Sequence, residues 1–128
     1  MDENIYIGLF CLDFEEAKKF YITNLGFKIK YDLDELTIQE NSRAILVHTI
    51  VKNLEVEFMT PQNNEETSRV GMSGGSMNLF TIPTKNIDLI KEKLENTKFF
   101  LNYSEPPYAS FLKLKDPMGN IIYLYERT

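Results

Sequence analysis

The sequence predicts a single α+β domain made of two consecutive halves with the same order of elements. Three observations lead to this fold class. Several segments alternate apolar and polar residues with period two, two segments have helical spacing, and the order strand, helix, strand, strand, strand occurs twice. At 128 residues, the chain has the length of one domain that can bury its own core. We expect a first module over 1–60, a linker over 61–75 and a second module over 76–128.

The first half begins with a strand over 4–11, in which odd positions are apolar and even positions include Tyr6 and Phe10. Asp13 and Glu16 have the spacing of a capping box, so we expect a helix to begin there and to end at Gly26. We expect three further strands over 27–33, 43–50 and 54–59.

Between the halves, the segment 61–75 has no hydrophobic periodicity and is rich in polar residues and glycines. We therefore expect it to connect the two modules. A strand over 77–82 follows. Asn86 then has the position of a helix cap, because Ile87, Ile90 and Leu94 come next at helical spacing. We expect the remaining strands over 98–103, 110–115 and 120–126, with a tight turn over 116–119.

Composition excludes several classes of protein. Nineteen acidic and fourteen basic residues give a formal charge of −5, which disfavours nucleic acid and anionic membranes as partners. The acidic N-terminus differs from the basic start of a secretory signal, and no apolar run approaches the ~20 residues of a membrane-spanning helix. The only cysteine, Cys11, cannot form a disulfide within the chain and is expected to be a small core residue. We therefore expect a cytoplasmic protein.

Two motifs carry a resemblance to a known family. The pattern F-Y-x-x-x-L-G-F over Phe20–Phe27 and the pattern D-P-x-G-N over Asp116–Asn120 resemble hallmarks of the vicinal oxygen chelate superfamily. This superfamily includes glyoxalase I, bleomycin-resistance proteins and extradiol dioxygenases. The resemblance implies two tandem βαβββ modules that form a curved, cup-like mixed sheet with helices on the outer face. It also implies a homodimer, with modules paired within one chain or swapped between chains.

In the metal-dependent members of the superfamily, one ligand lies on the first strand and one on the last strand of each module. The resemblance places these positions at Tyr6, Glu57, Met77 and Tyr123. Only Glu57 is a good ligand for a hard divalent cation, because methionine sulfur is too soft and a phenol with a pKa of about 10 must first lose its proton. We therefore expect neither a metal ion nor another cofactor.

The alternation of residues along the strands gives a separate argument for a pocket. Apolar positions face the helices, and the opposite face carries large aromatic, methionine and carboxylate side chains. The expected ligand-binding residues are Tyr6, Phe10, Glu55, Glu57, Met59, Met77, Tyr123 and Tyr125. The alternative is that these side chains fill the cup or cover a subunit contact, although burying Glu55 and Glu57 in a dry core would be costly.

Two functions from different classes remain open. The first is a metal-free small-molecule-binding protein that sequesters an aromatic or cationic ligand in the cup. The second is a metal-dependent lyase, isomerase or dioxygenase of the glyoxalase I type, which only the resemblance supports. Without a metal, Glu57 is the one candidate for a proton-transfer base. The single histidine, His48, is expected at a strand end or on the surface, and Lys28, Lys30, Lys113 and Lys115 on solvated strand faces.

Overall fold

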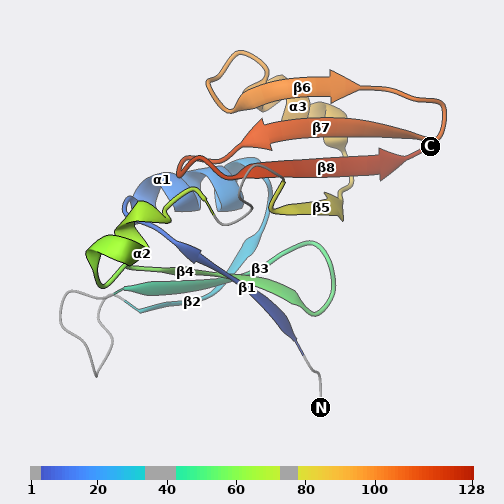
Figure 1. Ribbon diagram of the computed structural model, residues 1–128. Helices are drawn as coiled ribbons and strands as arrows, with labels where there is room; N and C mark the ends of the chain where they lie inside the picture. Colours follow the sequence, from blue (N-terminus) through green and yellow to red (C-terminus); the bar gives the residue numbers. More distant parts are fainter. Residues whose placement is uncertain (1–3, 34–42, 73–77) are drawn as a thin grey trace.

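The computed structural model describes residues 4–33, 43–72 and 78–128, which form two four-stranded sheets with short helices (Figure 1). The first half contains β1 (Ile5–Phe10), α1 (Phe14–Lys18), the π-helix η1 (Lys19–Asn24), β2 (Lys28–Leu33), β3 (Ala44–His48) and β4 (Leu54–Met59). The segment between the halves contains α2 (Asn64–Ser68). The second half contains β5 (Phe80–Pro83), α3 (Ile87–Leu94), β6 (Phe100–Ser104), β7 (Ala109–Lys115) and β8 (Ile121–Arg127). None of the helices in these ranges combines the length and the apolar character needed to cross a membrane.

The two sheets repeat one topology. Sheet 1 has the strand order β1-β4-β3-β2, and sheet 2 has the equivalent order β5-β8-β7-β6. In each sheet the first strand is parallel to the last one, and the other neighbours are antiparallel. The predicted α+β fold with tandem modules and mixed sheets is therefore confirmed.

One hydrophobic core joins the two sheets. The inward residues of sheet 1, such as Val56 and Phe58, belong to the same buried cluster as Leu112 and Leu124 of sheet 2. The helices α1, η1 and α3 contribute to this cluster, since α3 contacts η1 and α1 lies between the sheets (Figure 1). Each sheet consequently turns its helix-covered face toward the shared core. We call the other face of each sheet its open face, because no helix of the same module covers it.

The two sequence motifs meet inside this core. Tyr21 of the first motif is fully buried and donates a hydrogen bond of 2.6 Å to Oδ2 of Asp116 in the second motif. Oδ1 of Asp116 accepts from the backbone amides of Met118, Gly119 and Asn120, at 3.0, 2.9 and 2.8 Å. Asn120 adds a side-chain hydrogen bond of 3.0 Å to Oδ2. The motifs therefore serve the fold, because together they satisfy a buried carboxylate that joins the two modules.

Both helices begin where the sequence predicts, and the difference lies in the group that caps the second one. Asp13 accepts a hydrogen bond of 3.1 Å from the amide of Glu16, as a cap does, and Gly26 ends the helical segment with φ +81°. Asn86 was expected to cap α3, but its side chain makes no such bond. Instead Glu126, on β8, accepts from the amides of Asn86 and Ile87 at 3.3 and 3.0 Å. A residue 40 positions away cannot be found from local spacing.

The segment between the modules contains a helix that its sequence pattern did not reveal. In α2, Asn63 accepts from the amide of Glu66 at 2.8 Å, and Glu66 accepts from the amide of Gln62 at 2.9 Å. This is a reciprocal cap. None of the residues of α2 is buried, so the helix has no apolar face and no hydrophobic periodicity.

Candidate functional site

The open face of sheet 1 gathers five of the eight predicted ligand-binding residues. Strands β1 and β4 are adjacent and parallel, so the register pairs Tyr6 with Glu55, and Phe10 with Met59. Gly8 lies between them opposite Glu57, and a Cβ atom there would lie 3.2 Å from Cε of Met59. Glycine therefore leaves room for the Met59 side chain. Tyr6 is 55% exposed and Glu57 is partly exposed, whereas Glu55 is buried, so the described part of the chain leaves this face partly open to solvent.

Tyr31 completes this face, and the sequence pattern placed it elsewhere. The alternation along β2 groups Tyr31 with Phe27 and Ile29, which would make it inward-facing. A β-bulge between Ile29 and Tyr31 shifts the register by one residue and pairs Tyr31 with Leu46 on the open face. Its hydroxyl donates a hydrogen bond of 3.1 Å to Oε2 of Glu57. Burial, and then this hydrogen bond, raise the pKa of Tyr31 above its usual value.

Glu55 is the most unusual group on this face. Its side chain is fully buried, and neither carboxylate oxygen has a hydrogen-bond partner among the described residues. Two basic groups neighbour it: Nδ1 of His48 is 3.3 Å and Nζ of Lys30 is 3.5 Å from Oε2. His48 and Lys30 also line a cavity of about 590 Å³. Because Glu55 already has the Lys30 ammonium within 3.5 Å, Glu57 is the carboxylate better placed to attract a cation from solution.

The open face of sheet 2 is an aromatic surface with basic groups. Tyr123 and Tyr125 lie on β8, and the register pairs them with Lys113 and Phe111 of β7. The rings of Phe111 and Tyr125 have centroids 6.1 Å apart, and Nζ of Lys113 lies 5.8 Å from the ring centroid of Tyr123. Sequence reasoning missed Phe111 as a site residue and took Lys113 as merely solvated. The pairing of β7 with β8 is the signal that would have found both.

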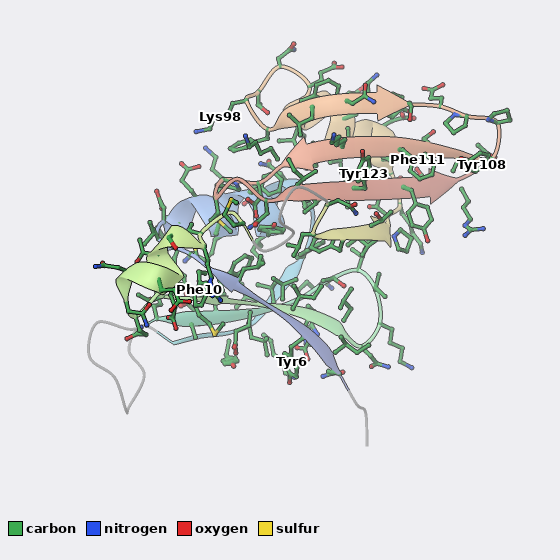
Figure 2. All side chains as sticks on the ribbon, viewed as in Figure 1. Tyr6, Phe10, Lys98, Tyr108, Phe111 and Tyr123 are labelled. Atoms are coloured by element: carbon green, nitrogen blue, oxygen red, sulfur yellow. The ribbon has the colours of Figure 1, made fainter. Side chains whose placement is uncertain are left out.

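The two open faces do not face each other within one chain. Both point away from the core that the modules share, and Figure 2 shows Tyr6 on sheet 1 well separated from Tyr123 and Phe111 on sheet 2. Met77 lies outside the described residues. A single chain therefore brings Tyr6 close to Glu57 but leaves Tyr123 on a different surface.

The residues at the expected metal positions do not fit a metal ion. Glu57 is the one hard ligand among them, and its carboxylate already accepts the Tyr31 hydrogen bond. Within residues 4–33, 43–72 and 78–128, no group of three or more His, Cys, Asp and Glu side chains could hold a metal ion. No metal-dependent reaction is therefore assigned to these residues.

Cys11 and His48 occupy the places that the sequence indicated. Cys11 is fully buried in the core. Burial, together with the charges of Asp116 and Asp13, raises the pKa of its thiol to about 12, so the reactive thiolate is scarce at neutral pH. His48 ends β3 with its side chain 46% exposed.

Comparison with known proteins identifies solved structures with a similar fold. No family model and no curated protein matches the sequence. The solved structure of TnmS3, an antibiotic binding protein from Streptomyces sp. CB03234, matches with a TM-score of 0.70 and 18% identity over 100% of this chain and 98% of that one. A glyoxalase/bleomycin resistance protein from the same organism matches with a TM-score of 0.67 and 20% identity, over 95% and 98% of the two chains.

The chain has the glyoxalase/bleomycin-resistance fold. Lactoylglutathione lyase from Agrobacterium tumefaciens shares this fold, with a TM-score of 0.60 and 17% identity over 95% of this chain and 91% of that one. At such identities the likeness concerns the fold alone, and the same fold carries binding proteins and enzymes. Function must be argued from the open faces.

Proposed function

We propose that the protein binds a small molecule of aromatic or cationic character, without a metal ion or cofactor, and that the open faces of the two sheets are the walls of its binding site. The observation that carries this proposal is the partly exposed cluster of Tyr6, Tyr31 and Glu57 on sheet 1. Aromatic rings offer large apolar area and attract cations to their faces, and a nearby carboxylate adds charge complementarity.

A homodimer is part of this proposal. Because the two open faces point away from the shared core, one chain supplies only one wall at any place on its surface. Two copies can each complete the other, with sheet 1 of one chain opposite sheet 2 of its partner. The charges favour this arrangement, since sheet 1 carries Glu57, whereas sheet 2 carries Lys113 and Arg127 near its tyrosines. A cytoplasmic location remains a prediction from the single unpaired cysteine.

The structural neighbours agree with a binding role. TnmS3 is an antibiotic binding protein, so an aromatic antibiotic is one ligand class that suits the proposal. The alternative, a metal-dependent lyase of the glyoxalase I type, has the fold of the lactoylglutathione lyase in its favour. The four expected ligand positions argue against a metal-dependent enzyme, because they provide a single hard donor.

Thermal-shift titration tests the proposal. A panel of three-ring aromatic compounds with matched size should include cationic, neutral and anionic members, for example acridine orange, anthracene methanol and anthracene carboxylate. We expect the cationic member to raise the melting temperature of the protein most, because a ligand that binds only the folded state stabilises it by mass action. Glu57→Gln should reduce that shift, whereas Glu92→Gln on the exposed side of α3 should leave it unchanged.

Elemental analysis of the purified protein distinguishes the alternative. Stoichiometric nickel, zinc, iron or manganese that is lost in Glu57→Gln would overturn the metal-free proposal. If no compound in a broad panel shifts the melting temperature of the wild-type protein, the interpretation of the open faces as ligand walls is wrong and they serve only as contact surfaces between copies.

A further inference from the structure

A second cavity lies away from the cluster of Tyr6 and Glu57. It has a volume of about 920 Å³ and is a groove between the modules. Its first wall comes from 23–28 and 48–50, where η1 ends and β3 turns toward β4. Its second wall comes from 83–93 and 125–127, which include α3 and the end of β8. We call this cavity the intermodule groove.

The charged side chains that line the groove are mainly basic, whereas the chain as a whole has more acidic than basic residues. The whole sequence has nineteen acidic and fourteen basic residues. The side chains that line the groove include four permanently basic ones, Lys28, Lys85, Lys93 and Arg127, and a single acidic one, Glu126. His48 also lies on its wall. A concave surface with this lining has a positive potential in an otherwise acidic protein, and such clefts concentrate anions.

Glu126, the one acidic side chain among the described residues that line the groove, already accepts two hydrogen bonds. Both oxygens of Glu126 accept backbone amides at the start of α3, from Asn86 at 3.3 Å and Ile87 at 3.0 Å. Within the described ranges, none of Lys28, Lys85 and Lys93 forms an ion pair, whereas Lys18, Lys30 and Lys91 each do. Among the described residues, Glu126 is therefore the one acidic side chain that lines the groove, and it caps α3.

The walls of the groove are also apolar. Leu89 on α3 is 56% exposed, and Ile50 after β3 is 43% exposed. Both line the groove, together with the buried Ile90. Large apolar side chains gathered in a concavity mark binding surfaces more often than isolated ones do. A bound molecule would thus gain both from the charges and from apolar contact.

From these observations we propose that the intermodule groove is a second binding site, specific for an organic anion: a carboxylate, sulfonate or phosphate joined to an apolar group. The apolar part lies against Leu89 and Ile50, and the anionic group is held by Lys28, Lys85 and Lys93. This site is separate from the cluster of Tyr6, Tyr31 and Glu57, although it shares Tyr125 and Arg127 with the open face of sheet 2. It prefers the opposite ligand charge.

The test uses 8-anilinonaphthalene-1-sulfonate, an apolar sulfonate whose fluorescence rises in apolar surroundings, and the neutral N-phenyl-1-naphthylamine as the matched uncharged probe. We expect the sulfonate to bind more tightly than the neutral probe, and its binding to weaken with added salt. The triple substitution K28Q/K85Q/K93Q should weaken sulfonate binding about tenfold, because it removes three exposed positive charges that each contribute modestly to binding the anion.

A control triple variant removes the same charge elsewhere. K19Q/K98Q/K115Q alters three lysines outside the groove, so it should bind the sulfonate as the wild type does. Equal weakening in both triple variants, or equal affinity for the two probes, would overturn the proposal. Amide chemical shifts provide a second measurement that does not need a variant: the sulfonate should perturb 83–93 and 125–127, and perturbations confined to β1 and β4 would also overturn it.

Discussion

At the scale of single residues, Asp116 is the group on which the junction of the modules depends. Its carboxylate is buried and accepts hydrogen bonds from three amides of its own turn, from Asn120 and from Tyr21 across the core. Burial, and then the charge of Asp116, raise the pKa of Tyr21 well above its ordinary value. Tyr21 therefore stays protonated and remains a donor throughout the physiological pH range.

Tyr21→Phe should lower the free energy of unfolding by about 1–3 kcal/mol, because it removes a donor from a buried carboxylate without creating a cavity. Urea denaturation at neutral pH measures the effect. Tyr108→Phe is the control, since Tyr108 is 67% exposed and should change stability little. Equal stability of Tyr21→Phe and wild type would mean that the 2.6 Å contact does not join the modules energetically.

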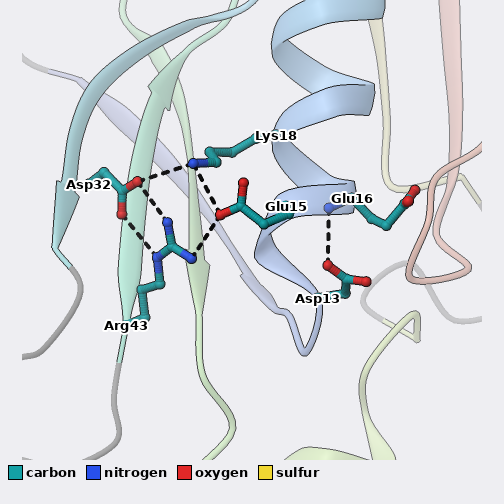
Figure 3. A network of polar contacts seen from close by, with 6 residues as sticks. All are labelled: Asp13, Glu15, Glu16, Lys18, Asp32 and Arg43. Carbon is teal, nitrogen blue, oxygen red and sulfur yellow. Dashed lines mark hydrogen bonds and ion pairs between the residues drawn. The ribbon is translucent and has the colours of Figure 1, made fainter.

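At the scale of elements, a charge network ties α1 to the adjacent strands (Figure 3). Arg43 precedes β3 and donates to Asp32 of β2 at 3.0 and 2.8 Å and to Glu15 of α1 at 3.3 Å. Lys18 of α1 bridges the same two carboxylates, with its Nζ 3.2 Å from Glu15 and 3.6 Å from Asp32. The hydrogen bond from Arg43 holds the pKa of Asp32 below its ordinary value of 3.8.

This lowered pKa predicts how acid acts on the network. Since the folded pKa of Asp32 lies below the unfolded one, its contribution to stability is present above about pH 4 and is lost as the pH falls through the folded value. Asp32→Asn should therefore lower stability by about 0.5–1 kcal/mol at pH 7, with the difference from wild type shrinking below pH 4. Calorimetry across pH 2–7 measures this. A constant difference, like that expected for Glu92→Gln, would contradict it.

A second feature of the elements is that the π-helix and the bulge decide which side chains reach the faces. The wider η1 follows α1 without a break and keeps both Phe20 and Tyr21 buried. The bulge in β2 turns Tyr31 outward to Glu57. Such irregularities re-aim single side chains without changing the order of the strands.

At the scale of the whole molecule, the direction of the open faces means that the proposed binding site needs residues from two chains. Within one chain the helices and the shared core lie between the sheets, so Tyr6 and Tyr123 lie on separate surfaces. A homodimer that places sheet 1 of one copy opposite sheet 2 of the other would form two equivalent sites, each with residues from both chains.

Mixing two variants with weakened binding tests this arrangement. Tyr6→Ala should impair sheet 1, and Tyr123→Ala should impair sheet 2, so each variant alone is expected to bind the cationic probe about tenfold more weakly, a loss of ~1.4 kcal/mol. In a mixed dimer one site contains both substitutions and the other contains neither. Calorimetric titration should therefore recover wild-type affinity at one site per mixed dimer. If each site lay within one chain, mixing would restore no binding.

By itself, the sequence determined most of the elements and their repeated order. Alternation with period two identified the strands, and Asp13 and Gly26 marked the ends of the first helical segment, because these signals depend on neighbouring residues. The same alternation assigned Tyr6, Glu57 and Tyr123 to faces away from the core. The sequence pattern could not identify the exposed helix α2, because a helix without a buried side has no apolar periodicity.

Only the tertiary structure decided the features that join distant residues. Glu126 caps α3 from 40 positions away, a bulge turns Tyr31 to Glu57, and the modules meet through Tyr21 and Asp116, 95 positions apart. The intermodule groove arises from the same packing, because its two walls belong to different modules. Local patterns describe which face of an element is apolar, whereas the direction of that face in space follows from how the elements pack.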